Sequence, residues 1–175
     1  MELNFSDAAP LMCVSMTTFN ALRHSGANPG DKVAIVGLAG LGHLAVQCAS
    51  KMGFRTVVVA REKDREQLAK ALGADTYIQT STCDYSNVDL RSREGAEGVG
   101  GALVILATAP SSELQVSLVQ ALRPNGRMII LAGDPKPLQL PAASLITWCR
   151  LIRLSRRKRA YRNMGSARFR AVLTM

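Results

Sequence analysis

The sequence of 175 residues contains no apolar run as long as the roughly 18 residues that a membrane-spanning helix needs. Its first ten residues, MELNFSDAAP, have no basic segment and carry acidic residues early, so they do not read as a secretory signal. The four cysteines are scattered and form no C-x-x-C pair, which argues against a disulfide framework and a self-contained zinc site. We therefore expect a cytoplasmic protein in a reducing compartment, without a membrane partner.

Acidic residues are also absent from the end of the chain. Residues 1–149 hold 13 Lys/Arg and 13 Asp/Glu, whereas residues 150–175 hold nine basic residues and none that is acidic. This tail accounts for the whole net charge of +9, and it could bind nucleic acid or an acidic membrane surface. Aromatic residues for base stacking are sparse there (Trp148, Tyr161 and Phe169), so we favour a divergent or disordered end without nucleic acid.

The most informative segment is KVAIVGLAGLGHLAVQCASKMG, residues 32–53. Residues 32–36 are apolar and β-branched, as in a strand that is buried on both faces. From Leu41 onward the apolar residues follow helical spacing. The glycine-rich turn between them aims free backbone N–H groups and the positive end of the helix dipole at one point. Such a point suits a pyrophosphate.

The dinucleotide fingerprint G-x-G-x-x-G falls on Gly37, Ala39 and Gly42. The first position supports the tight turn and the third allows close packing of helix on strand, whereas the middle one, where the backbone approaches the phosphates, carries a methyl group. A glycine-rich turn that binds nothing is the alternative. We predict dinucleotide binding through Gly37, Leu38, Ala39, Gly40, Leu41, Gly42 and His43.

Strands and helices alternate along the body of the chain. We predict strands over 32–36, 55–59, 75–79, 102–107, 127–132 and 151–154, and helices over 6–23, 40–52, 63–72, 111–122 and 138–148. The helix over 63–72 should turn Leu68, Ala71 and Leu72 inward, and residues 124–126 should form a turn. The polar segment 80–101 needs a crossover helix, for which 88–93 is a weak candidate. This alternation predicts one α/β domain with a doubly wound parallel sheet of Rossmann type, an N-terminal helix and a basic irregular tail.

Four segments resemble the cofactor domain of medium-chain dehydrogenase/reductases, that is, the zinc-dependent alcohol dehydrogenases and their cinnamyl-alcohol-type relatives. They are DAAPLMCVSMTTFNALR, PGDKVAIVGLAGLGHLAVQCASKMGFR, KALGAD and LRPNGRMIILAG, and they cover about residues 6–140 in the order and spacing of the family. The resemblance implies NAD(P)-linked oxidation of alcohols to aldehydes or ketones, or the reverse. In the family a zinc ion polarises the alcohol oxygen and a hydride passes to the nicotinamide.

The resemblance also implies site residues. Cys13 matches a cysteine that supplies one ligand of the catalytic zinc, and Thr17 matches a threonine near the nicotinamide. Catalytic zinc needs three protein ligands, and no second one can be named here. In the family a whole catalytic domain precedes this helix, whereas 12 residues precede Cys13. We therefore expect no zinc held by this chain alone and little or no turnover; a small buried cysteine is the alternative for Cys13.

The residues at the end of the second predicted strand indicate whether NADP or NAD is the preferred coenzyme. NAD-selective relatives place an aspartate there to bind the ribose 2′-hydroxyl, and the matching residue here is Ala60, 23 residues after Gly37. The cations Arg61, Lys63 and Arg65 follow. A 2′-phosphate would meet cations and no repelling carboxylate, which favours NADP over NAD. Alternatively, these charges form a solvated helix start, partly paired with Glu62, Asp64 and Glu66.

Three functions stay open at this point. The chain is the NAD(P)-binding domain of a zinc-type alcohol dehydrogenase, inactive or weakly active by itself. Alternatively, it is a non-catalytic protein that binds a nicotinamide dinucleotide and forms a homodimer through its sheet edge, as the resemblance suggests. The third possibility is a basic interaction protein on a relic scaffold.

Overall fold

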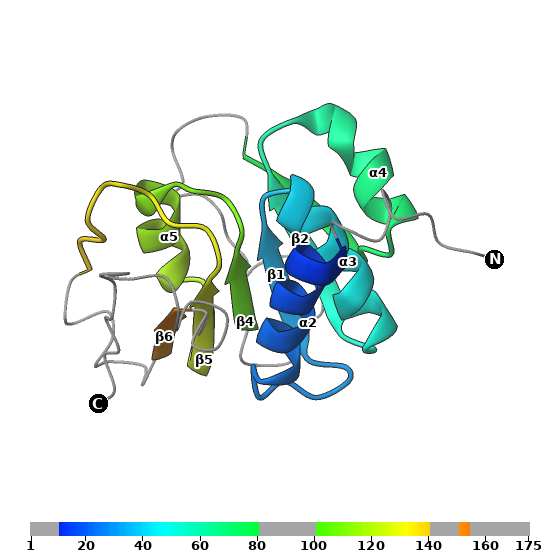
Figure 1. Cartoon of the computed structure of the whole chain (residues 1–175), viewed down its shortest axis with the longest axis horizontal. Coiled ribbons are helices and arrows are strands. Elements are labelled where there is room, and N and C mark those ends of the chain that lie inside the picture. Colours follow the sequence, from blue (N-terminus) through cyan, green and yellow to red (C-terminus); the bar gives the residue numbers. More distant parts are fainter. Residues whose placement is uncertain (1–10, 81–100, 141–150, 155–175) are drawn as a thin grey trace.

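The structure, a computed structural model, describes residues 11–80, 101–140 and 151–154 (Figure 1). Its helical elements are η1 (Leu11–Ser15, π-helical), α2 (Met16–Arg23), α3 (Gly40–Lys51), η2 (Lys63–Arg65, 3₁₀), α4 (Glu66–Ala71) and α5 (Ser112–Val119). Its strands are β1 (Lys32–Val36), β2 (Arg55–Ala60), β3 (Thr76–Gln79), β4 (Ala102–Ala107), β5 (Leu122–Ile130) and β6 (Leu151–Leu154). Across these residues, the helices are too short or too polar to cross a bilayer.

The strands form one six-stranded sheet in the order β3-β2-β1-β4-β5-β6, and every neighbouring pair is parallel. This confirms the predicted doubly wound α/β fold. The chain reverses its direction of winding between β1 and β4, where Val36 pairs with Ala107. On the other side of β1, Val36 pairs with Val59 of β2. The loops that follow these three strands therefore all leave from the carboxyl-terminal ends of the strands, which is where ligands bind in this fold.

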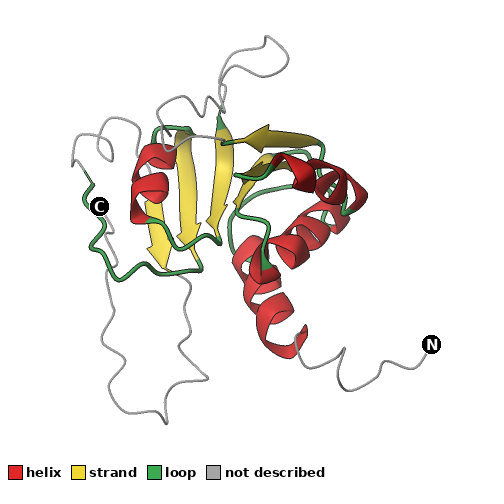
Figure 2. Ribbon diagram, turned by 90° about the horizontal axis from the view of Figure 1, so that it is seen from above, coloured by secondary structure: helices red, strands yellow, loops and turns green. Residues whose placement is uncertain are grey.

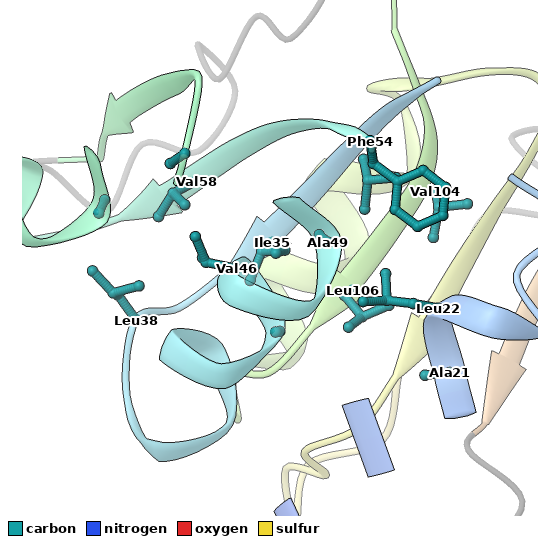
Figure 3. Packing of buried hydrophobic residues seen from close by; sticks show 14 of the residues in the cluster. Ala21, Leu22, Ile35, Leu38, Val46, Ala49, Phe54, Val58, Val104 and Leu106 are labelled. Atoms are coloured by element: carbon teal, nitrogen blue, oxygen red, sulfur yellow. The ribbon is translucent and has the colours of Figure 1, made fainter. Parts of the chain in front are cut away.

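The side chains of successive strand residues point to opposite faces of the sheet, and a separate hydrophobic core lies on each face. On one face, residues such as Ile35, Val58 and Leu106 pack against α2, α3 and α4; Figure 3 shows this cluster, with Leu38 of the glycine turn at its margin. On the other face, residues such as Ala34 and Ile105 pack against Leu114, Leu118 and Val119 of α5. In Figure 2, α5 accordingly lies apart from the other helices. Burial on both faces explains why the central strands are continuous apolar runs.

Helix α3 ends at a glycine. Gly53 has φ +79°, its N–H donates to Ser50 O at 3.0 Å, and the next N–H, of Phe54, donates to Ala49 O at 3.1 Å. This pair of bonds satisfies carbonyl groups at the end of the helix that would otherwise lack partners. The same arrangement at Gly73 ends α4.

Helix α4 differs from the prediction in the face that it buries. Leu68 is 49% exposed and Ala71 is exposed, whereas Ala69 is fully buried, and only Leu72 of the predicted inward residues packs against the core. The physical reason is that residues 63–65 form a 3₁₀ turn, with three residues per turn, ahead of a six-residue α-helix. The tighter turn shifts the phase of every later side chain.

Strand β5 begins earlier than predicted and includes the expected turn. In its pairing with β4, Leu122 lies opposite Ala102 and Arg127 lies opposite Val104. Between these pairs β5 has more residues than β4, and they form a bulge in which Asn125 has φ +61°. Residues 138–140 are not helical, and the remainder of the predicted helix over 138–148 lies outside the described residues. The predicted features at residues 6–10, 88–93 and 155–175 also lie outside them, whereas β6 forms where the sequence predicted it.

Candidate functional site

The glycine turn between β1 and α3 is tightly packed at two of its glycines. Gly37 has φ +97°, and a Cβ there would lie 3.1 Å from Ala109 Cβ. A Cβ on Gly42 would lie 1.9 Å from Gly37 O, which leaves no room for any side chain. Glycine is therefore required at Gly42 by the lack of space and favoured at Gly37 by the left-handed backbone. Thus the first glycine makes the turn and the third lets the helix approach the strand, as the fingerprint predicts.

The middle of the turn is open. Ala39, the N-cap of α3, is exposed and has an extended backbone (φ −97°, ψ −158°), so its methyl group causes no backbone strain. A Cβ on Gly40 would meet nothing within 4 Å. Within the described part of the chain, the N–H groups of Ala39 and Gly40 have no hydrogen-bond acceptor. The first turn of this 12-residue helix holds no acidic residue, so its free N–H groups and dipole can receive an anion.

Three other predicted turn residues have distinct places. Leu38 is buried in the core, so only its backbone faces the turn. Leu41 is half-buried in the first turn of α3. His43 folds back on the turn: its N–H donates to Ala39 O at 3.0 Å, and its Nδ1 lies 3.2 Å from the same oxygen. His43 thereby stabilises the N-terminus of the helix.

Thr108, which the sequence analysis missed, braces the turn from the neighbouring strand. It follows β4, and its buried Oγ1 lies 2.8 Å from Val36 O and 3.1 Å from Gly37 O, so that its single O–H is shared by the end of β1 and the turn. The sequence shows only that a threonine directly follows the strand at the switch point. Its contact with the turn depends on the pairing of β4 with β1.

The predicted basic residues lie next to the turn, at the end of β2. Ala60 closes the strand, and Arg61 and Lys63 are exposed beyond it. Arg65 instead reaches back: its Nη1 donates to Leu38 O at 3.0 Å, while its Nε pairs with the carboxylate of Glu62. The structure thus brings one of the three cations into contact with the glycine turn.

Tyr77 holds the same loop from β3. Its hydroxyl donates to Glu62 O, and the ring is buried in the core. Burial, together with the negative charge of Asp64, raises the pKa of the Tyr77 hydroxyl. A tyrosine hydroxyl is already protonated at neutral pH, so the raised pKa keeps Tyr77 a hydrogen-bond donor further into the alkaline range.

The N-terminus of α5 also lies at the carboxyl-terminal ends of the strands, and there a carboxylate of the protein itself accepts its hydrogen bonds. The carboxylate of Asp134 accepts hydrogen bonds from Lys136 N at 3.0 Å, Ser112 N at 2.9 Å and Ser112 Oγ at 3.0 Å. The bonds from the backbone N–H groups of Lys136 and Ser112 lower the pKa of Asp134. This helix end is capped by a side chain of the protein itself, whereas among the described residues no side chain caps the N-terminus of α3.

Cys13 and Thr17 lie on η1 and α2, which pack against α3 (Figure 1). Cys13 is exposed, so it is not the small buried residue of the alternative interpretation. The Thr17 hydroxyl donates to Cys13 O at 2.7 Å. Over residues 11–80, 101–140 and 151–154, no three His, Cys, Asp or Glu side chains gather in a way that could hold a metal ion. The described residues therefore do not provide a zinc site.

Known proteins share both the sequence and the fold. Residues 40–174 match the zinc-binding dehydrogenase family. Alcohol dehydrogenase patD of Penicillium expansum is 42% identical over 131 residues, which are 75% of this chain and 36% of that protein. An alcohol dehydrogenase of Geobacillus stearothermophilus is 36% identical over 140 residues, 80% of this chain and 40% of that protein. The crystal structure of AibC is 26% identical with a TM-score of 0.76, over 87% of this chain and 45% of that one.

These matches cover most of this chain, which spans well under half the length of the curated relatives. The TM-score of 0.76 shows that the overall fold is shared as well. The chain belongs to the zinc-binding dehydrogenase family, in which it corresponds to the NAD(P)-binding domain of zinc-type alcohol dehydrogenases.

Proposed function

We propose that this domain binds a nicotinamide dinucleotide with the pyrophosphate over the glycine turn of residues 37–43. The observation that carries the proposal is the pair of unpartnered N–H groups at Ala39 and Gly40 within the described chain, at the start of a helix with no acid in its first turn. The turn lies at the switch point between β1 and β4, where this fold binds ligands. Helix α5 offers no equivalent site because Asp134 caps it.

We further propose that the preferred coenzyme is NADP. Ala60 stands at the end of β2 where a carboxylate would repel a 2′-phosphate, and exposed Arg61 and Lys63 follow it. Two cations can pair with a phosphate by charge-assisted hydrogen bonds. NAD lacks that phosphate and would gain nothing from them.

An activity is proposed from the longer relatives of the family. A bound nicotinamide exchanges a hydride with an alcohol or aldehyde. The described residues of this chain hold and orient the coenzyme, with Thr17 proposed on the nicotinamide side and Cys13 as a single former zinc ligand. Because the described residues do not form a metal site, we expect the chain by itself to bind coenzyme with little or no turnover.

A homodimer through the sheet edge is proposed as well. Among the described strands β6 stands at one end of the strand order, and such an edge strand offers N–H and C=O groups to another strand. Light scattering during size-exclusion chromatography tests this by the mass of the particle. A mass of one chain over the range of concentrations used for binding would contradict it.

Titration calorimetry with NADPH and NADH tests the main proposal. We expect heat with both coenzymes and tighter binding of NADPH. A variant with Arg61→Gln and Lys63→Gln should lose the preference for NADPH while it keeps the affinity for NADH. Absence of heat with either coenzyme at millimolar concentration would refute the proposal, and tighter binding of NADH would refute the preference. Aldehyde reduction after addition of zinc would show that the chain alone is catalytic.

A further inference from the structure

Arg65 connects the loop after β2 to the glycine turn, and this contact assigns it a different role from its basic neighbours. We infer that Arg65 is a positioning residue, which fixes the peptide between Leu38 and Ala39, and not a ligand of the 2′-phosphate. The part of this inference that concerns affinity rests on the proposed coenzyme function. The part that concerns the turn itself does not.

A chain of three contacts holds the guanidinium group in place. The hydroxyl of Tyr77, a buried residue of strand β3, donates to the backbone oxygen of Glu62. The Glu62 carboxylate pairs with Arg65 Nε, and Arg65 Nη1 donates to Leu38 O at 3.0 Å. Tyr77 thus holds the backbone of Glu62, while the Glu62 carboxylate and Leu38 O together orient the guanidinium group. Arg65 reaches the turn from 27 residues further along the sequence, and its side chain is 41% exposed.

The geometry of the peptide bond turns this contact into a constraint on the site. A trans peptide is planar, so its C=O and N–H groups point in opposite directions. When Arg65 holds Leu38 O on one side, it also fixes the direction of the Ala39 N–H on the other. Ala39 occupies the middle position of the fingerprint, where the backbone approaches the phosphates. Arg65 therefore preorients an N–H group that the proposed site needs.

The same contacts make Arg65 less suited to bind the 2′-phosphate of NADP. Two of its donor nitrogens are engaged, and the Glu62 carboxylate offsets its charge. A phosphate would have to compete with that carboxylate. Arg61 and Lys63 are exposed beside the end of β2, so they are better placed for a phosphate that arrives from solvent.

Two measurements on Arg65→Gln test the role. The first is amide hydrogen exchange of Gly37 and His43, whose N–H groups donate to Val59 O at 2.8 Å and Ala39 O at 3.0 Å on either side of the turn. We expect their exchange to become on the order of tenfold faster, the size expected for loss of a hydrogen bond with a charged donor. The second is affinity, which should fall by a similar factor for NADH and NADPH alike.

Two further variants control the experiment. Lys70→Gln removes a cation from α4, the helix that directly follows Arg65; Lys70 pairs with Glu66 at 2.7 Å, and this variant should change neither measurement. Arg65→Lys keeps the positive charge but lacks the planar fork that bonds Glu62 and Leu38 together, so it should fall between wild type and Arg65→Gln. Thermal unfolding of each variant shows that it is folded.

The outcomes separate the alternatives. If Arg65→Gln weakens NADPH by tenfold or more while NADH binding is unchanged, Arg65 is a phosphate ligand and the inference fails. Unchanged exchange at Gly37 and His43 refutes it as well. If the wild-type protein binds neither coenzyme, the proposed function fails, and the exchange comparison still decides whether Arg65 positions the turn.

Discussion

Replacement of Gly42 by alanine tests the physical basis of the glycine turn. The added Cβ would lie 1.9 Å from Gly37 O and 2.8 Å from Gly37 C, and both partners are backbone atoms that cannot rotate away. Since real Cβ contacts essentially never fall below 3.0 Å, the start of α3 and the end of β1 must separate by about 1 Å. Overpacking of this kind costs about 1–3 kcal/mol, or more where the backbone has to move.

The matched control is Gly40→Ala in the same turn. A Cβ there meets nothing within 4 Å, and no left-handed backbone is required, because Gly40 begins a helix. Alanine restricts the unfolded chain and favours the helix, so this variant should gain about 0.4–1 kcal/mol. The two substitutions add the same methyl group two residues apart and should change stability in opposite directions.

The assay is thermal unfolding of both variants with the wild type. For a chain of this size, 1 kcal/mol shifts Tm by roughly 2–4 °C. We therefore expect Gly42→Ala to lower Tm by about 2–12 °C and Gly40→Ala to raise it by about 1–4 °C. An unchanged Tm for Gly42→Ala, or an equal loss for both variants, would refute the close approach of helix and strand on which the site depends.

Further predictions concern the coenzyme, the core and pH. Ala60→Asp should reverse the preference, with NADPH weakened by about tenfold or more by charge repulsion and NADH retained, as measured by calorimetry. Leu22→Ala, in a fully buried position, should cost about 2–5 kcal/mol in urea unfolding, whereas Leu68→Ala, at a half-exposed position, should stay within about 0.5 kcal/mol. The lowered pKa of Asp134 means that its stabilising effect is present above the ordinary aspartate pKa and is lost as the pH falls through its pKa in the folded protein. Wild-type Tm should therefore fall more steeply in acid than that of Asp134→Asn, and an identical pH profile would contradict the role of the Ser112 cap.

The strands and the glycine turn could be predicted from local patterns. Strands β1 and β4 begin and end where the sequence predicts, because both are apolar runs covered on two faces. Helix α4 was predicted with the wrong inward face, since the six helical residues follow a 3₁₀ turn that apolar spacing does not reveal. The early start of β5 was missed because its bulge carries the residues of a turn.

The sequence by itself determined the parallel α/β architecture and the position of the glycine turn, since hydrophobic periodicity and glycine spacing are local properties of the chain. Only the tertiary structure decided which distant side chains support that turn. Thr108 meets Gly37 across 71 residues and Arg65 meets Leu38 across 27, and such contacts depend on strand order, which no local pattern encodes. Tertiary packing also separated Arg65, which is held by Glu62 and the turn, from Arg61 and Lys63, which face solvent.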